Sequence, residues 1–500
     1  MANDVPVTRS DKTSLSTRIG LFVLALITLG ALIIAKPTRH LQDFDQPFYV
    51  TLAYDLDRYG VFSNGPFSGV DDTAAAPPAG MFFGPVYPAL VAAVMKLDPR
   101  FAAAARCSVE SNRGHRDIAT CDPYDLPMRL LNALLLAIAV IAVAVSAELI
   151  FRRRAMFVAA GVCVLVALAF EASAFSYIMT ESLIFALYSV FMLAMVLAWR
   201  SGRPAHFIVG GLLLGLLCLT KPSYLVLFPI VAALSFVYMY WLADPRRPHA
   251  LGRVVAFSLA FACVAGAWVA RNGVSVGKLG FTEEYGAVVL IERFAYNDMT
   301  VREFFEAFPY CTPGLGEVVF DPVYGTDSMH RFTYHTKGSF FHLGRGRRDV
   351  LVAQYGRLDP LISSIIRDEM RHDWWRHLLI SIPLMWCGLW AGWLASLVLV
   401  PLFVWACIRA GRTRQPLLLF YAAPAVAMLG LDALIGNHYT RYNLILMGPY
   451  AVGAASIMTS WLSGVPGAHW RWRSLASAPL SAPSATAASD ADSTSPSDSG

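Results

Sequence analysis

The chain has 500 residues, of which 56% are apolar and 15% are charged, and its mean hydropathy is +0.51. A typical soluble domain carries about 25% charged residues, so this composition excludes a soluble globular protein and indicates a polytopic membrane protein. The net charge of +5 comes without an array of basic and aromatic residues, so we predict no nucleic-acid partner.

Apolar runs long enough to cross a bilayer recur along the chain. We therefore expect an all-α polytopic membrane protein with about 10–11 transmembrane helices and two large external loops. The clear runs are 19–35, 128–150, 156–174, 181–199, 206–220, 225–242, 253–270, 386–408, 416–436 and 443–461. The first run ends Ile-Ile-Ala-Lys-Pro without a small-residue cleavage site, so we predict that it remains as a membrane anchor.

Basic residues follow every second run, and they predict the orientation of the chain. The basic groups are Arg9, Lys12 and Arg18 before the first run, then Arg152–Arg154, Arg200 and Arg203, Arg246, Arg247 and Arg253, Arg409, Arg412 and Arg414, and Arg471 and Arg473. Because such residues stay on the cytoplasmic side, both termini are predicted to be cytoplasmic. Residues 1–18 would form the N-terminal segment. Residues 462–500, rich in Ser, Ala, Pro and Asp, would form a disordered tail.

Two external regions are too long to be simple turns. The first, 36–127, belongs to a transmembrane catalytic core at 19–270, and the second, 271–376, is predicted to be an α/β or irregular cap before the C-terminal helices at 377–461. In the first region, residues 48–59 have helical periodicity and predict a helix on the membrane surface. Residues 81–97 contain prolines and predict an interfacial or re-entrant segment.

The eight cysteines suggest one disulfide. Cys107 and Cys121 both lie in the first external region, where an oxidising compartment would allow them to pair. Cys311 is expected to be an unpaired external thiol. The others, including Cys387, lie in predicted spans, where a thiol acts as a small apolar filler.

The segment Asp43-Phe44-Asp45 lies close after the first apolar run. A carboxylate at the rim of a membrane is where a membrane-embedded enzyme would hold a general base. The alternative is structural: Asp45 precedes Gln46-Pro47 and the periodic stretch, so it equally fits the cap of that helix.

Three basic residues lie at the predicted external ends of spans: Lys221, Arg271 and Arg441. Their position is unusual, because basic residues near spans are enriched on the cytoplasmic side. Such groups suit a phosphate that leaves with negative charge, and the alternative for each is snorkelling towards lipid phosphates. Arg129 is interpreted as a span-end anchor. Glu181 fits either an external cavity or a structural hydrogen bond, and Asp432 fits a structural ion pair with Arg441.

Three histidines of the second external region lie close together: His330, His335 and His342. Their spacing fits no zinc signature, so we interpret them as solvated loop residues. No cofactor is predicted. A divalent metal stays possible, but the sequence gives it no clear ligand set.

The stretch from Asp45 to Tyr49, DQPFY, resembles the Asp-Glu-x-x-Tyr region of integral-membrane glycosyltransferases of the GT-C type, and in particular the protein O-mannosyltransferase and aminoarabinose transferase branch. Six more segments resemble that family in the expected order: Pro85–Pro88, Arg129–Asn132, Thr180–Ser182, Gly215–Pro222, Trp268–Asn272 and Arg441–Tyr442. The departure is Gln46, where many relatives carry Glu, so one carboxylate of the matching pair is missing.

This resemblance implies an inverting hexosyl- or pentosyltransferase in the inner (cytoplasmic) membrane. It would move a sugar from a polyprenyl-phosphate donor to a hydroxyl or amine on an external glycan, lipid or protein. Asp45, assisted by Asp43, would be the base, and Lys221, Arg271 and Arg441 would bind the phosphate; Glu181 and Tyr49 are further candidates. Two alternatives stay open. One is a polysaccharide polymerase or ligase using Arg345–Arg348 and His342, and the other is a lipid-linked sugar flippase or transporter.

Overall fold

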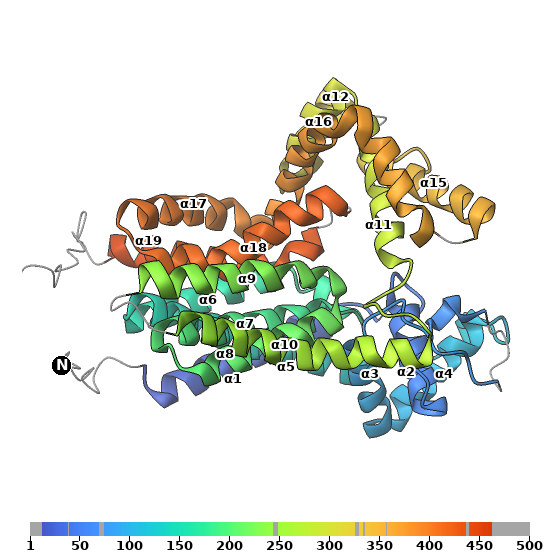
Figure 1. Cartoon of the computed structure of the whole chain (residues 1–500), viewed down its shortest axis with the longest axis horizontal. Coiled ribbons are helices and arrows are strands. Elements are labelled where there is room, and N and C mark those ends of the chain that lie inside the picture. The colour runs from blue at the N-terminus through green and yellow to red at the C-terminus, as the bar shows by residue number, and fades with distance from the viewer. Residues whose placement is uncertain are drawn as a thin grey trace, which may run out of the picture.

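Long apolar helices run side by side along the length of the molecule, and shorter helices gather at one end (Figure 1). The computed structural model describes residues 13–38, 40–69, 75–243, 249–325, 330–333, 336–356, 358–436 and 440–462. The basic residues Arg9, Lys12, Arg246, Arg247, Arg471 and Arg473, His335 and the tail beyond residue 462 lie outside these ranges.

Eight of the described helical segments are long and apolar enough to cross a membrane. They are Leu15–Ile34 (α1), Leu126–Phe151 (α5), Glu181–Ser201 (α7), Pro222–Leu242, Ala250–Ser275 (α10), Trp393–Arg412, Pro416–Ile435 (α18) and Thr440–Leu462. Two shorter apolar helices, Arg154–Phe170 (α6) and Pro204–Thr220 (α8), pack among them. The prediction of an all-α polytopic membrane protein is confirmed, and these ten segments match the ten apolar runs in order.

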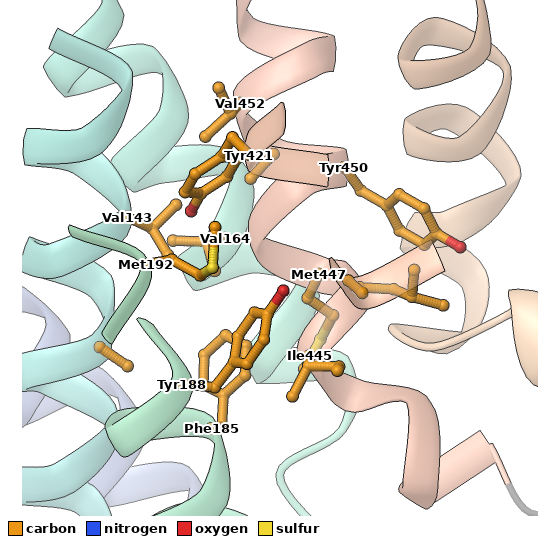
Figure 2. Packing of buried hydrophobic residues seen from close by; sticks show 14 of the residues in the cluster. Val143, Val164, Phe185, Tyr188, Met192, Tyr421, Ile445, Met447, Tyr450 and Val452 are labelled. Atoms are coloured by element: carbon orange, nitrogen blue, oxygen red, sulfur yellow. The ribbon is translucent and has the colours of Figure 1, made fainter. Parts of the chain in front are cut away.

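The bundle is held by close packing of helices, because lipid gives no hydrophobic force between them. α8 packs against α7 and α10, and Gly211 makes the contact with α10 possible: a Cβ there would lie 2.2 Å from the carbonyl oxygen of Phe257. Aromatic and branched side chains of α7, α18 and Met447–Leu462 (α19) fill the centre (Figure 2). Tyr188, Tyr421 and Tyr450 are almost completely buried there.

Arg129 lies inside the protein, so its interpretation as an anchor to lipid is wrong. Its side chain is 3% exposed. It donates to Asp125 Oδ1 at 2.8 Å and to the backbone carbonyls of Ile33, Lys36 and Pro37. These carbonyls lie at and just beyond the C-terminus of α1, where the helix leaves acceptors without intrahelical donors. Arg129 therefore ties α5 to the end of α1.

The first external region folds into Gln46–Tyr59 (α2), Val86–Leu97 (α3) and Pro99–Asn112 (α4). α2 packs on α3 and α4, and its buried residues include Val50 and Tyr54. The predicted helix is present, but protein rather than a lipid surface covers this side of it. A disulfide joins Cys107 of α4 to Cys121.

The second external region is helical, so the expectation of an α/β or irregular cap is wrong. Its main helices are Tyr285–Phe294 (α11), Val301–Cys311 (α12), Phe340–Tyr355 (α15) and Ile362–Leu389 (α16), and its described residues contain no strand. They project from the bundle beyond α18 (Figure 1).

A disulfide between Cys311 and Cys387 corrects two predictions about this cap. Cys311 is not an unpaired thiol, because α12 packs against α16 and places the two cysteines together across 76 residues of sequence. Cys387 belongs to the long helix α16, and the next span begins at Trp393 instead of residue 386.

Candidate active site

A cavity lies where the bundle meets the helices of the two regions predicted to be external. It has about 420 Å³ of free space, counting its open mouth. We call it the Asp45 cavity. The side chains that give it its chemistry are Asp45, Tyr49, Glu181, Lys221, Tyr285 and Tyr442.

Asp45 lies at the N-terminus of α2 but makes no side-chain capping bond. Its Oδ2 instead accepts a hydrogen bond from Nη2 of Arg441 at 2.8 Å, and its side chain is 40% exposed. The capping alternative therefore does not describe this side chain. Asp45 is a carboxylate at the cavity wall, paired with one cation and accessible from the open side.

Gln46 fixes the loop that carries Asp45. Its side-chain amide is buried, and Nε2 donates to the carbonyls of His40 and Asp43, each at 3.2 Å. Oε1 accepts from the backbone N–H of Ile178 at 2.9 Å. A glutamate carboxylate cannot donate the first two bonds, which gives a physical reason for Gln at this position.

Phe44 adds a strained turn to the same loop, because its φ is +57°, a value that L-residues rarely adopt. Its ring packs edge-on against Tyr177, with the ring centroids 5.0 Å apart. Of the two predicted acids, only Asp45 lines the cavity. Asp43 is not among the lining residues, and its backbone carbonyl serves the loop by accepting from Gln46.

Arg441 holds two carboxylates of the cavity wall without being among the lining residues itself. Besides its bond to Asp45, its Nε lies 3.9 Å from Oε1 of Glu181. Glu181 is the first residue of α7, where the helix dipole favours a negative charge, and it is 8% exposed. Glu181 therefore faces the cavity and is also part of an ion-pair network.

Lys221 follows the last residue of α8 and lies over the ring of Tyr442, with Nζ 3.6 Å from the ring centroid. This is a cation–π contact. Asp432 and Glu181 both interact electrostatically with Lys221.

The predicted ion pair of Asp432 with Arg441 is wrong. Arg441 pairs with Asp45 and Glu181, because the fold places the start of α2 and the start of α7 beside it.

Arg271 is held in the structure by backbone carbonyls. Its guanidinium donates to Gly80 O at 2.6 Å and to Phe62 O at 2.9 Å, and it lies over the Trp268 ring at 4.9 Å. It is not among the residues that line the Asp45 cavity. The structure thus brings Lys221 and Arg441 to the predicted base and leaves Arg271 as a clamp on the first external region.

Tyr285 and Tyr442 are cavity residues that the sequence did not single out. Tyr442 stands in a matched segment, but only its neighbour Arg441 was assigned a role. Tyr285 stands in no matched segment, and only the fold of α11 brings it to the cavity. Burial raises the pKa of Tyr285 well above its usual range. Burial likewise raises the pKa of Tyr49, and the carboxylates of Asp45 and Glu181 add to the effect. Both phenols therefore stay protonated and can donate hydrogen bonds.

Three arginines of the cap form ion pairs with glutamates of the cap. Arg345 and Arg348 pair with Glu292, and Arg347 pairs with Glu369. Among the residues that the structure describes, no group of three or more His, Cys, Asp or Glu side chains could hold a metal ion.

No family model matches the chain, and no curated protein matches it. Solved structures of an oligosaccharyltransferase from Archaeoglobus fulgidus are similar to it in shape. The match to the complex with zinc and sulfate has 13% sequence identity and a TM-score of 0.43. It covers 89% of this chain and 50% of the oligosaccharyltransferase chain. The match to the complex with an inhibitory peptide and a dolichol-phosphate has 13% sequence identity and a TM-score of 0.45. It covers 89% of this chain and 51% of the oligosaccharyltransferase chain. This chain spans about half the length of those proteins, and a likeness at these values carries no activity over to it.

Proposed function

We propose that this chain is a membrane glycosyltransferase that moves a sugar from a polyprenyl-phosphate donor to an acceptor on the outer side of the cytoplasmic membrane. One observation carries the proposal: the pair of Asp45 and Arg441 lies in one site with Lys221, at the end of the bundle where a lipid phosphate would lie. The ordered motif resemblance in the sequence supports the same reaction.

Binding of the donor is proposed to rearrange the cations. The pair between Asp45 and Arg441 is partly exposed, and pairs of this kind contribute about 1 kcal/mol or less. A phosphate can accept two parallel bonds from Arg441, whereas Asp45 accepts a bond from Nη2. A phosphate that takes Arg441 and Lys221 would therefore release the Asp45 carboxylate for chemistry.

The proposed transfer is a single displacement. The acceptor hydroxyl oxygen attacks the anomeric carbon while Asp45 takes its proton, and the bond from that carbon to the phosphate oxygen breaks. The phosphate leaves with the electron pair, and Lys221 and Arg441 stabilise the negative charge that develops on it. The configuration at the anomeric carbon inverts. In this proposal Tyr49 and Tyr285, which line the cavity, donate hydrogen bonds to hydroxyl oxygens of the bound substrates.

The test is a transfer assay with purified protein and a polyprenyl-phosphate sugar, in which release of polyprenyl phosphate is measured. Asp45→Asn should lower kcat by about 100-fold or more, the range expected for loss of a general base. Asp57→Asn is the matched control, since Asp57 lies on the same helix and outside the cavity. Wild-type turnover by folded Asp45→Asn protein would remove Asp45 from the mechanism.

The same assay separates the proposal from a flippase or transporter. A transporter would move the intact donor across a vesicle membrane and release no polyprenyl phosphate. Release that depends on an added acceptor supports the transferase, and the acceptor that restores it identifies the acceptor class.

A further inference from the structure

A second cavity lies at the opposite end of the bundle, where α6 and α18 begin and α17 (Ser396–Arg412) and α19 end. It has about 410 Å³ of free space, counting its mouth. We call it the Arg409 cavity. Its polar wall contains Arg153, Arg409, Gln415, Thr459 and Ser460. No Asp or Glu occurs among the described residues that line it.

The Arg409 cavity is polar at its wall and apolar at its base. Arg409 Nη1 donates to Ser460 Oγ at 3.3 Å, which holds the guanidinium beside a hydroxyl of α19. Met156, Ala406, Ala410 and Leu418 are each 1–2% exposed and add only apolar surface. A ligand that fills this space must therefore carry a group for the arginines and an apolar part for the base.

The charges at this end favour an anion. Helices α6 and α18 bring their N-termini, each equivalent to roughly +0.5 charge, and α5, α17 and α19 bring C-termini of roughly −0.5 each. These partial charges sum to about −0.5. Arg153 and Arg409 add one formal positive charge each, so these helix ends and the two arginines together carry a net positive charge at the cavity.

We propose that the Arg409 cavity binds the phosphate of an anionic phospholipid, with the guanidinium groups on the phosphate and the glycerol region against Met156 and Leu418. The cavity lies at helix ends, which is the depth of lipid head groups in a bilayer. Soluble phosphate shares the anion chemistry but would leave the apolar base in contact with water, so the lipid is the occupant that the cavity fits.

The experiment measures the Tm of the full chain in neutral detergent during titration with three probes: dioctanoyl phosphatidylglycerol, dioctanoylglycerol and inorganic phosphate at matched ionic strength. Ligands that bind only the folded state raise the stability by RT ln(1 + L/Kd), where L is the free ligand concentration, so the dependence of Tm on ligand concentration gives an apparent Kd. We expect Tm to rise with the logarithm of the phosphatidylglycerol concentration above its Kd, and to rise much less with dioctanoylglycerol, which lacks the phosphate.

Two arginines of the same helical turn give a matched pair of variants. Arg409→Gln should raise the apparent Kd for phosphatidylglycerol, obtained from the Tm titration, by about tenfold, which corresponds to the loss of one charge-assisted contact. Arg412→Gln should leave it unchanged, since Arg412 is exposed and does not line the cavity. Arg153→Gln, at an exposed position before α6, is the second test should Arg409→Gln fail to fold.

Each outcome decides the proposal. A rise in Tm with inorganic phosphate alone that depends on Arg409 would overturn the lipid as the occupant and assign the anion site to soluble phosphate. Equal weakening by Arg409→Gln and Arg412→Gln would overturn the site, because it would indicate general attraction to a basic surface. An equal response to dioctanoylglycerol and phosphatidylglycerol would also overturn it.

Discussion

Asp45 and Arg441 are 396 residues apart in the sequence, and their side chains are joined by a 2.8 Å hydrogen bond. The bond links the start of α2 to the segment that leads into the last transmembrane helix. It brings together a proposed base and a proposed phosphate ligand, so the two roles are coupled through one contact.

Replacement of Arg441 should test this coupling. We expect Arg441→Gln to lower kcat/KM for the donor by about 100-fold or more, in the range measured when one transition-state donor is removed. Lys96→Gln, at an exposed site of α3, is the control. Steady-state kinetics over a range of donor concentrations measures the effect. An unchanged kcat/KM would show that Arg441 contributes neither to donor binding nor to the transfer.

Gln46→Glu should weaken the loop that carries Asp45. The carboxylate would face the carbonyl oxygens of His40 and Asp43 in a buried position and lose both donated bonds, at a cost of about 1–3 kcal/mol. We expect a lower Tm and a lower kcat. Gln354→Glu, exposed on α15, should change neither. A fully active and equally stable Gln46→Glu protein would contradict the role assigned to the amide.

Gly84 lies at the cavity wall against the end of α8. A Cβ at this position would lie 2.1 Å from the carbonyl oxygen of Leu219, so Gly84→Ala must displace backbone two residues before Lys221. We expect about a tenfold or greater loss of kcat, since misplacement of a catalytic group by about 1 Å has effects of that order. Gly286→Ala, which meets no atom within 4 Å, is the control.

Arg271 should affect stability more than donor binding. Arg271→Met removes the bonds to the Phe62 and Gly80 carbonyls, and we expect a loss of about 1–3 kcal/mol. The Tm in detergent should fall while the KM of the folded protein for the donor changes by less than about twofold. A large rise in KM for the donor with an unchanged Tm would instead support the prediction that Arg271 binds the donor phosphate.

Much of the fold was predictable because hydropathy and periodicity are local properties of the chain. Ten apolar runs correspond in order to ten helical segments of the bundle. The span boundary at 386 and the cap were predicted less well. The Cys311–Cys387 disulfide and the helix α16 depend on packing between segments that are far apart in sequence.

The sequence by itself determined the membrane class, the acid at the rim of the first span and the cations at span ends, since each follows from residue type and distance to an apolar run. Only the tertiary structure decided which of these charges meet. It paired Asp45 with Arg441, placed Lys221 over Tyr442, turned Arg271 to backbone carbonyls and brought Tyr285 to the cavity. The reason is physical: a side chain's partner is set by the packing of whole helices, which no local pattern records.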